Sequence, residues 1–300
     1  MNTYKNGNTI VSIKSDGTKI RYVPDNQQAE PEFPESIDMK ITNKCSMNCP
    51  MCHEKSTPYG YHGNLNHPLL DSLRPYTELA VGGGDPLSHP DLEFFLKRMK
   101  DRKVICNITV HWKQFLNNYK TLKYWEQEGL IHGVGVSVTE VVPEDVINMM
   151  IGFPNLVVHA ILGIINEHLL NMLSDKDLNV LLLGYKVFGR GVDYRFNHER
   201  SIDDNIMVLS NKIETMYKHF RAVSFDNLAI KQLKLKEKMT PAAWKQFYMG
   251  DDGTFTMYVD LVKNEYAVSS TSPERNNIDD NDIETLFANI KRKDDVLCTK

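Results

Sequence analysis

Residues 42–52 read TNKCSMNCPMC and place Cys45, Cys49 and Cys52 in one short segment. The segment directly follows an apolar strand that we predict over residues 36–42. Thiolates are the usual protein ligands of iron–sulfur clusters, and three of them can hold three corners of a cubane cluster. The fourth iron then stays open to a ligand that is not protein. Because a structural metal site normally has four protein ligands, a site that lacks one indicates chemistry.

Other interpretations of the cysteines stay open. The letters CPMCH from Cys49 to His53 match c-type haem attachment, which leaves Cys45 unused and needs an export signal that the polar N-terminus does not resemble. A thioredoxin-like CxxC pair leaves Cys45 unused as well. A zinc site would take His53 as its fourth ligand, although the adjacent Cys52 and His53 are poorly placed to point at one metal. Buried cysteines without a metal are the simplest alternative.

A glycine run forms a second motif. Gly82, Gly83 and Gly84 end the next predicted strand, over residues 76–82, and Asp85 follows them. Glycine permits positive φ and a close approach of backbone to a ligand, but a glycine run after a strand is more often a simple turn. Because ligands gather at the carboxyl ends of parallel strands, we expect this run and the cysteines on the same rim of the sheet.

The CxxxCxxC spacing and the glycine run together resemble the radical S-adenosylmethionine (radical SAM) superfamily. The resemblance implies that Cys45, Cys49 and Cys52 hold a [4Fe-4S] cluster whose open iron is chelated by S-adenosylmethionine (SAM). It further implies that one-electron reduction splits SAM and that the resulting 5′-deoxyadenosyl radical abstracts hydrogen from a substrate. In this division of labour the cofactor carries the hard chemistry while the protein binds and orients it. A flavodoxin- or ferredoxin-like electron donor and sensitivity to oxygen are also implied.

The resemblance implies roles for further residues around SAM. Residues 82–85 stand where the family binds the methionine amine, with Asp85 in place of the usual Glu. Met51 stands where the family commonly has an aromatic residue near the adenine, and its thioether is apolar and adaptable. Ser137, at the end of the fourth strand, is implied as a ribose or carboxylate contact. By position rather than by the resemblance, the Gly-Arg-Gly segment after the sixth strand is either a simple loop with an exposed arginine or a turn that brings backbone against the adenine and aims Arg190 at an anion.

Strands and helices alternate from residue 36 onward. We predict strands over 36–42, 76–82, 104–110, 132–139, 155–163 and 178–184. We predict helices over 66–74, 90–102, 112–128, 143–151, 166–174 and 202–220. The later strands are near-continuous apolar runs, which suit a parallel sheet buried on both faces. The alternation favours the α/β class, and the resemblance implies a (β/α)6 partial TIM-like barrel.

The chain divides into three predicted regions. Residues 1–35 form a short N-terminal β-hairpin or meander with a linker, residues 36–225 the barrel, and residues 226–300 a small α+β C-terminal extension. In the extension we predict helices over 241–248 and 279–291 and strands over 254–260 and 265–269. This order resembles the SPASM/twitch extension, which in the family binds auxiliary clusters through several cysteines. Because the region has only Cys298, we expect no auxiliary cluster.

Polar residues at the predicted strand ends are further candidates by position. A lone histidine there is more often a structural group than a catalytic one. The candidates are Asn107, Thr109, His111, Thr139, Glu140, His159 and Asn166.

The composition is that of an ordinary globular protein, with 41% hydrophobic and 25% charged residues and a net charge of -4. No basic stripe indicates general nucleic-acid binding, and no apolar run approaches the roughly 18–20 residues of a membrane helix. Three of the five cysteines share one loop, which disfavours a disulfide framework and favours a reduced, cytoplasmic setting.

The substrate stays open between a peptide or protein, slightly favoured by the tail order, and a small molecule. The alternative function is a sensor or scaffold that binds the cluster and SAM without cleaving SAM. The departures at Asp85 and Met51 motivate that alternative.

Overall fold

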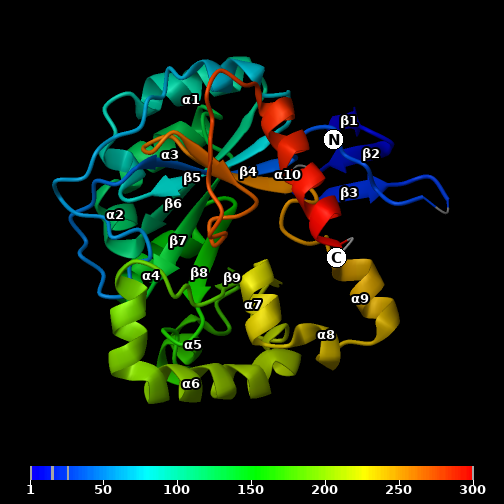
Figure 1. Ribbon diagram of the computed structural model, residues 1–300. Coiled ribbons are helices and arrows are strands. Elements are labelled where there is room, and N and C mark those ends of the chain that lie inside the picture. The colour runs from blue at the N-terminus through cyan, green and yellow to red at the C-terminus, as the bar shows by residue number, and fades with distance from the viewer. Residues whose placement is uncertain (1, 15–16, 26, 299–300) are drawn as a thin grey trace.

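The computed structural model of the chain describes residues 2–14, 17–25 and 27–298 (Figure 1). Its centre is a sheet with the strand order β10-β9-β8-β7-β6-β5-β4-β11-β12-β13. Neighbouring strands from β10 to β11 are parallel, whereas β12 and β13 are added antiparallel. Helices cover the outer face of this curved sheet (Figure 1). The α/β class and the partial TIM-like barrel are confirmed.

The predicted barrel strands are present, and each begins and ends within two residues of its predicted range. They are β4 (Ser36–Thr42), β5 (Glu78–Gly83), β6 (Ile105–His111), β7 (Gly133–Val138), β8 (Leu156–Ile161) and β9 (Asn179–Leu183). The structure adds β10 (Ala222–Phe225), which extends the sheet in parallel beside β9. This strand was not predicted because it is short and lies against the sheet edge, where two of its four residues are exposed.

The helices of the barrel differ from the prediction in three places. The segment predicted at 66–74 is a short 3-10 helix, η1 (Pro68–Ser72), and the one predicted at 112–128 is divided at Asn118. The long helix α6 begins at Arg190 rather than at residue 202 and has a kink at His198. Figure 1 shows this kink as a corner between two arms of α6. The helices of this region are α1 (Leu92–Asp101), α2 (Trp112–Asn117), α3 (Tyr119–Gln127), α4 (Glu144–Ile151), α5 (Glu167–Leu173) and α6 (Arg190–Met216).

Alternate residues of each barrel strand face opposite sides of the sheet. Those facing the helices are buried, and Leu79, Ile108 and Val158 have no exposed surface. Those on the other side, which we call the concave face, are mostly partly buried, although Lys40 is buried. The concave face includes Asp38, Lys40, Glu78, Asn107, Thr109, Ser137 and His159. Apolar burial therefore stabilises the outer layer, while the polar inner layer is accessible to a ligand.

The N-terminal region is a meander of β1 (Asn2–Asn6), β2 (Thr9–Ile13) and β3 (Lys19–Tyr22), with antiparallel pairing throughout. Gly7 has φ 60° in the first turn, a conformation that glycine adopts without strain. The sheet is tied to the barrel by Lys19 Nζ, 2.9 Å from Glu78 Oε2, and by Arg21 Nη2, 2.8 Å from Glu35 Oε2. The predicted N-terminal β unit is thus present, and it consists of a hairpin with a third strand added.

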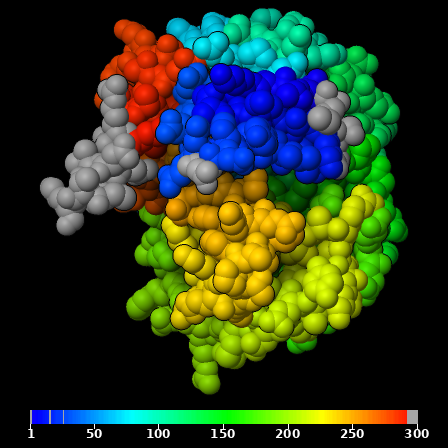
Figure 2. Space-filling view, turned by 90° about the vertical axis from the view of Figure 1, so that its right-hand side faces the viewer, coloured from blue at the N-terminus to red at the C-terminus, as the bar shows by residue number. Residues whose placement is uncertain are grey.

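The C-terminal region is built into the barrel sheet. Its strand β11 (Thr256–Asp260) pairs in parallel with β4, and β12 (Glu265–Ala267) returns beside β11 as the predicted hairpin. Figure 2 shows this region against the N-terminal sheet, where the Arg21 guanidinium lies 4.3 Å from the ring centre of Phe255. The remaining elements are α7 (Asn227–Gln232), α8 (Leu235–Lys238), α9 (Pro241–Phe247), β13 (Asn276–Asn277) and α10 (Ile283–Cys298). Among the described residues, no helix is both long enough and apolar enough to cross a membrane.

Candidate cofactor site at the cysteine loop

The cysteine loop, residues 43–57, leaves the carboxyl end of β4 and closes on itself. The Cys45 amide donates to Thr57 O at 2.8 Å, and the Thr57 amide donates to Asn43 O at 3.2 Å. Between these ends the Cys52 amide donates to Cys49 O at 3.2 Å, which forms a tight turn. The backbone hydrogen bonds thus bring the three cysteines together from positions four and three residues apart.

The three thiols share one environment. Each is partly buried, and their sulfurs lie close enough that negative charge on one disfavours ionisation of the next. Burial, followed by the charges of Cys52 and Cys45, raises the pKa of Cys49 to about 11. Burial also raises the pKa of Cys45, to which Gln114 Nε2 donates at 3.8 Å. Metal binding to this set would therefore release protons, as it does at thiolate sites in general.

Arg190 binds the cysteine loop from outside. Its Nε donates to Cys49 O and its Nη1 to Ser56 O, both at 3.0 Å, and its backbone amide donates to Cys52 O at 2.9 Å. Gly189 precedes it with φ 57°, and a Cβ there would lie 2.3 Å from His53 O. The start of α6 therefore packs on the loop, and the guanidinium is used on loop carbonyls rather than aimed at an anion.

The glycine run packs on the same loop from the other side. The Gly84 amide donates to Thr42 O at 2.8 Å, and the Asp85 amide donates to Lys44 O at 2.7 Å. A Cβ on Gly84 would lie 2.4 Å from Lys44 O, so only glycine allows this approach. Gly82 differs, because the nearest atom to a Cβ there is 3.8 Å away, which leaves room on the concave face. The two sequence motifs therefore meet at the carboxyl ends of β4 and β5.

Asp85 has a local structural role in addition to the one that the resemblance implies. Its Oδ1 accepts from the Leu87 amide at 3.1 Å and caps the short 3-10 helix η2 (Pro86–Ser88). Burial raises the pKa of Asp85, while the Leu87 amide and Gln114 oppose that rise.

Met51 and Ser137 lie at other points of the rim. Met51 packs against a small apolar cluster that includes Ile164 and Tyr185, which follow β8 and β9. Ser137 is on the concave face of β7, in register with His111 of β6 and His159 of β8. These positions leave both residues available to a ligand on the concave face, and their roles toward SAM remain predictions.

Several rim residues that were candidates by position have structural partners. His111 Nδ1 accepts from the Lys113 amide at 3.2 Å and caps α2, while its Nε2 lies 3.2 Å from Thr139 Oγ1. Asn166 caps α5 through the Leu169 amide at 2.9 Å. The other partners are Glu140 with Lys113 at 2.6 Å and Asn107 with Glu78 at 2.6 Å.

His159 is the exception among these candidates. Its ring lies on Gly135, where a Cβ would be 2.3 Å from Cε1 of the ring. Its Nδ1 is buried without a hydrogen-bond partner among the described residues. Burial, and then the charge of Lys186, lowers the pKa of His159 to about 4, so the ring is neutral at pH 7.

Sequence reasoning missed a set of charged residues beside the cysteine loop. Lys40 Nζ lies 2.6 Å from Glu54 Oε2 and 3.2 Å from Asp260 Oδ2, and all three side chains are at most 13% exposed. Burial lowers the pKa of Lys40, but Glu54 and Asp260 outweigh burial and hold that pKa above its ordinary value. A lysine within an apolar strand was the available signal, since such a residue needs a buried partner.

Lys186 is a second missed cation on this rim. Its Nζ donates to Ser270 Oγ at 2.9 Å and lies 3.5 Å from His53 Nε2. Burial, and then the charge of Lys186, lowers the pKa of His53. The same nitrogen lies 3.4 Å from Glu54 Oε1, so His53 Nε2 lies between a cation and a carboxylate. His53 thus faces Lys186 and Glu54, which opposes the zinc alternative that used it as a ligand.

The donor set fits an iron–sulfur cluster better than a single metal ion. Among the described residues, no three Cys, His, Asp or Glu side chains converge as the ligands of one ion must. In a cubane cluster each thiolate binds a different iron, so the sulfurs stay apart around the cluster. Three thiols on one loop, next to a glycine run with open space at Gly82, match that requirement.

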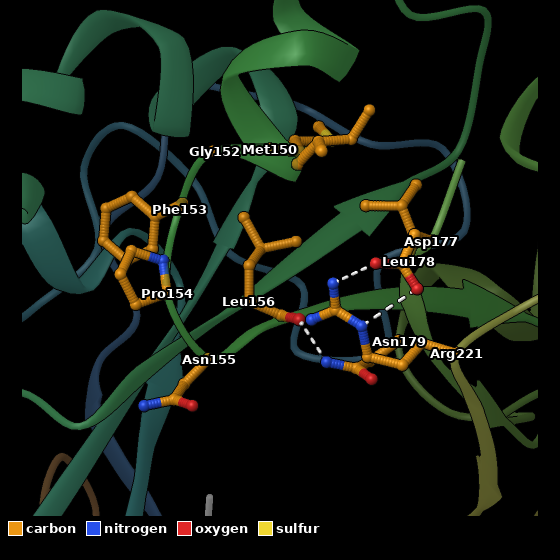
Figure 3. Close-up of a pocket in the computed structure, with 11 residues that line it drawn as sticks. Met150, Gly152, Phe153, Pro154, Asn155, Leu156, Asp177, Leu178, Asn179 and Arg221 are labelled. Carbon is orange, nitrogen blue, oxygen red and sulfur yellow. Dashed lines mark hydrogen bonds and ion pairs between the residues drawn. The ribbon is translucent and has the colours of Figure 1, made fainter.

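The described cavities lie on the opposite side of the barrel. One, of about 230 Å³, is at the amino ends of β8 and β9 (Figure 3). Its wall includes Arg221, which pairs with Asp177, and Asn179, which donates to Leu156 O at 3.2 Å. Residues at the amino ends of barrel strands usually contribute to stability, whereas ligands bind at the carboxyl ends.

Comparison with solved structures found proteins of similar architecture. SuiB of Streptococcus suis bound to S-adenosylmethionine has a TM-score of 0.57 with this chain at 12% identity, covering 86% of this chain and 66% of SuiB. The chain therefore shares the fold of SuiB. SuiB bound to the precursor peptide SuiA gives a TM-score of 0.54 at 11% identity, over 86% of this chain and 65% of SuiB.

These comparisons confirm the predicted resemblance at the level of the fold. This chain spans slightly less than two thirds of the length of SuiB. Scans against protein-family models and curated proteins found no match.

Proposed function

We propose that this protein is a radical SAM enzyme. The observation that carries the proposal is the meeting of two motifs at one rim: the Gly84 and Asp85 amides donate to backbone carbonyls that flank the cysteine loop. Cys45, Cys49 and Cys52 would hold a [4Fe-4S] cluster, and the amine of SAM would lie against residues 82–85. When bound, the pair of cofactors supplies reductive cleavage of SAM to a 5′-deoxyadenosyl radical that abstracts hydrogen from the substrate.

The chain's own residues would bind and orient these groups. Arg190 and Gln114 hold the loop and one of its sulfurs in place, and the concave face offers polar side chains such as Ser137 and His159. The electron would come from a flavodoxin- or ferredoxin-like protein.

A peptide or protein is the substrate class that we favour. SuiB, which shares the fold, was crystallised with its precursor peptide SuiA. The hairpin of β11 and β12 also matches the order of elements expected of the C-terminal extension in peptide-modifying enzymes. A small-molecule substrate is the competing choice.

The test is anaerobic purification followed by incubation with SAM and dithionite. The wild-type protein should carry about four iron atoms per chain and release 5′-deoxyadenosine. Changing Cys45, Cys49 or Cys52 to Ala should remove the bound iron and the product. Cys106→Ala is the matched control, because Cys106 is buried in the core of β6 and should leave the iron content unchanged.

Two other outcomes would decide against the proposal. Stoichiometric iron with intact SAM would favour the alternative function, a cluster-binding sensor or scaffold. A colourless protein with one zinc ion per chain would favour the zinc interpretation.

A further inference from the structure

Two chains of side-chain contacts start in the C-terminal region and end on the cysteine loop. In the first, Asp260 of β11 contacts Lys40 Nζ at 3.2 Å, and the same nitrogen contacts Glu54 at 2.6 Å. In the second, Ser270 accepts from Lys186 at 2.9 Å, and Lys186 lies 3.5 Å from His53. The first chain ends on Glu54 and the second on His53, the two residues that follow Cys52.

The side chains of the first chain are buried, and each has a charged partner. Asp260 and Lys40 are 5% and 6% exposed, and Glu54 is 13% exposed. Charged groups so deep in the protein keep their positions because moving one leaves the others unpaired. The other oxygen of Asp260 accepts from the Val262 amide at 2.9 Å and from the Lys263 amide at 3.1 Å, which fixes the carboxylate to the hairpin turn.

Backbone contacts support the same arrangement. The Leu261 amide donates to Lys40 O at 3.0 Å, directly beyond the β11–β4 pairing. A Cβ on Gly63, just past the cysteine loop, would lie 2.7 Å from Leu261, so this part of the C-terminal region packs tightly on the chain that leaves the loop. The C-terminal region therefore contacts the chain on both sides of the cysteine loop.

We propose that the C-terminal region, which carries none of the three loop cysteines, positions the cofactor loop, and that Asp260 and Ser270 act as positioning residues through Lys40 and Lys186. The proposal rests on the proposed function only for the identity of the cofactor. It assigns the C-terminal region a task at the first cluster instead of the auxiliary cluster that the family's extensions hold.

The test compares Asp260→Asn with Ser270→Ala and the double variant. Asparagine retains an oxygen for the Val262 and Lys263 amides while placing an amide nitrogen opposite the Lys40 ammonium, so the turn is preserved and the contact is lost. The matched control is Asp280→Asn with Ser272→Ala, which makes the same chemical changes at two residues of the C-terminal region that belong to neither chain of contacts.

The first readout is hydrogen exchange in cluster-free protein, followed for the peptide that covers residues 43–57. We expect at least about tenfold faster exchange of the Cys45, Cys52 and Thr57 amides in the double variant, and wild-type exchange in the control. The second readout is the reconstituted cluster, for which we expect an altered electron paramagnetic resonance spectrum and faster loss of iron.

Loop exchange as slow in the double variant as in the wild type would overturn this inference. Faster loop exchange in a protein that never binds iron would instead refute the proposed function and leave the positioning role standing. Faster loop exchange together with a changed cluster spectrum would support both.

Discussion

Lys40→Met removes the cation from between two buried carboxylates. Glu54 and Asp260 lie 2.6 and 3.2 Å from the same nitrogen, so their oxygens are at most about 5.8 Å apart. At an effective dielectric constant of about 20, two unit charges at that separation repel by about 3 kcal/mol. Leaving buried charges unpaired typically costs about 3–5 kcal/mol, so we expect the free energy of unfolding at pH 7 to fall by that amount.

The assay is urea denaturation from pH 4.5 to pH 7.5. In the wild type, burial raises the pKa of Glu54, but His53 and Lys40 outweigh burial and hold that pKa well below its ordinary range. The contribution of Glu54 to stability is therefore present above about pH 4.3 and is lost as the pH falls below that value. In the variant the two carboxylates repel with no cation between them, so protonation of either one relieves the repulsion and its deficit relative to the wild type should decrease as the pH falls from 7.5. The contribution of Glu54 in the wild type is constant across this pH range, so the difference in stability between the wild type and the variant should shrink as the pH falls.

Lys97→Met is the matched control. Lys97 lies 2.6 Å from Glu93, but these side chains are 55% and 43% exposed, so we expect a loss of no more than about 0.5 kcal/mol. If Lys40→Met costs as little as this control, or if its deficit relative to the wild type does not shrink on acidification, the three groups are not a coupled buried network.

Three further changes probe the barrel rim. Gly135→Ala should cost about 1–3 kcal/mol in urea denaturation, because the new Cβ would lie 2.3 Å from the ring of His159. The pKa of His159 is about 4 in the folded state and about 6.5 in the unfolded state. The free energy of unfolding should therefore fall by about 2–3 kcal/mol as the pH is lowered from 6.5 to 4. Thermal scans should show a shallower decline for His159→Phe. Asp226→Ala should cost about 1–2 kcal/mol, since its Oδ1 accepts from the Ala229 amide at 2.6 Å and the Gly184 amide at 2.9 Å, and Asp226→Asn should recover most of the loss in the same urea assay.

The barrel strands were predictable because each is a local apolar run with its own turn signals. The segment 36–42, for example, matches β4 residue for residue. The meeting of the cysteine and glycine motifs was also predictable, because consecutive parallel strands end at one rim. A strand order and two motifs at strand ends therefore sufficed to predict the location of the site.

The role of Arg190 was not predictable from its neighbours. A glycine on each side indicates a turn, and Gly191 disfavours a helix by about 1 kcal/mol relative to alanine. In the structure that glycine is required, because a Cβ there would lie 2.5 Å from Lys186 O. Tertiary packing therefore overrides helix propensity, and the side chain that was predicted to face an anion binds the carbonyls of Cys49 and Ser56.

The contacts of the C-terminal region depend on long-range pairing, for which the sequence has no local signal. Thr256 lies beside Ser36 across the sheet, although most of the barrel separates them along the chain. This pairing places Asp260 beside Lys40 in register, so a lysine that would be costly alone in a buried strand has its partner. Lys40 was the visible anomaly, and the reasoning that finds its partner is general: a charge predicted within an apolar parallel strand requires an opposite charge from a neighbouring strand in register. Here that neighbour is β11, which joins the edge of β4 and brings the C-terminal region to the cysteine loop.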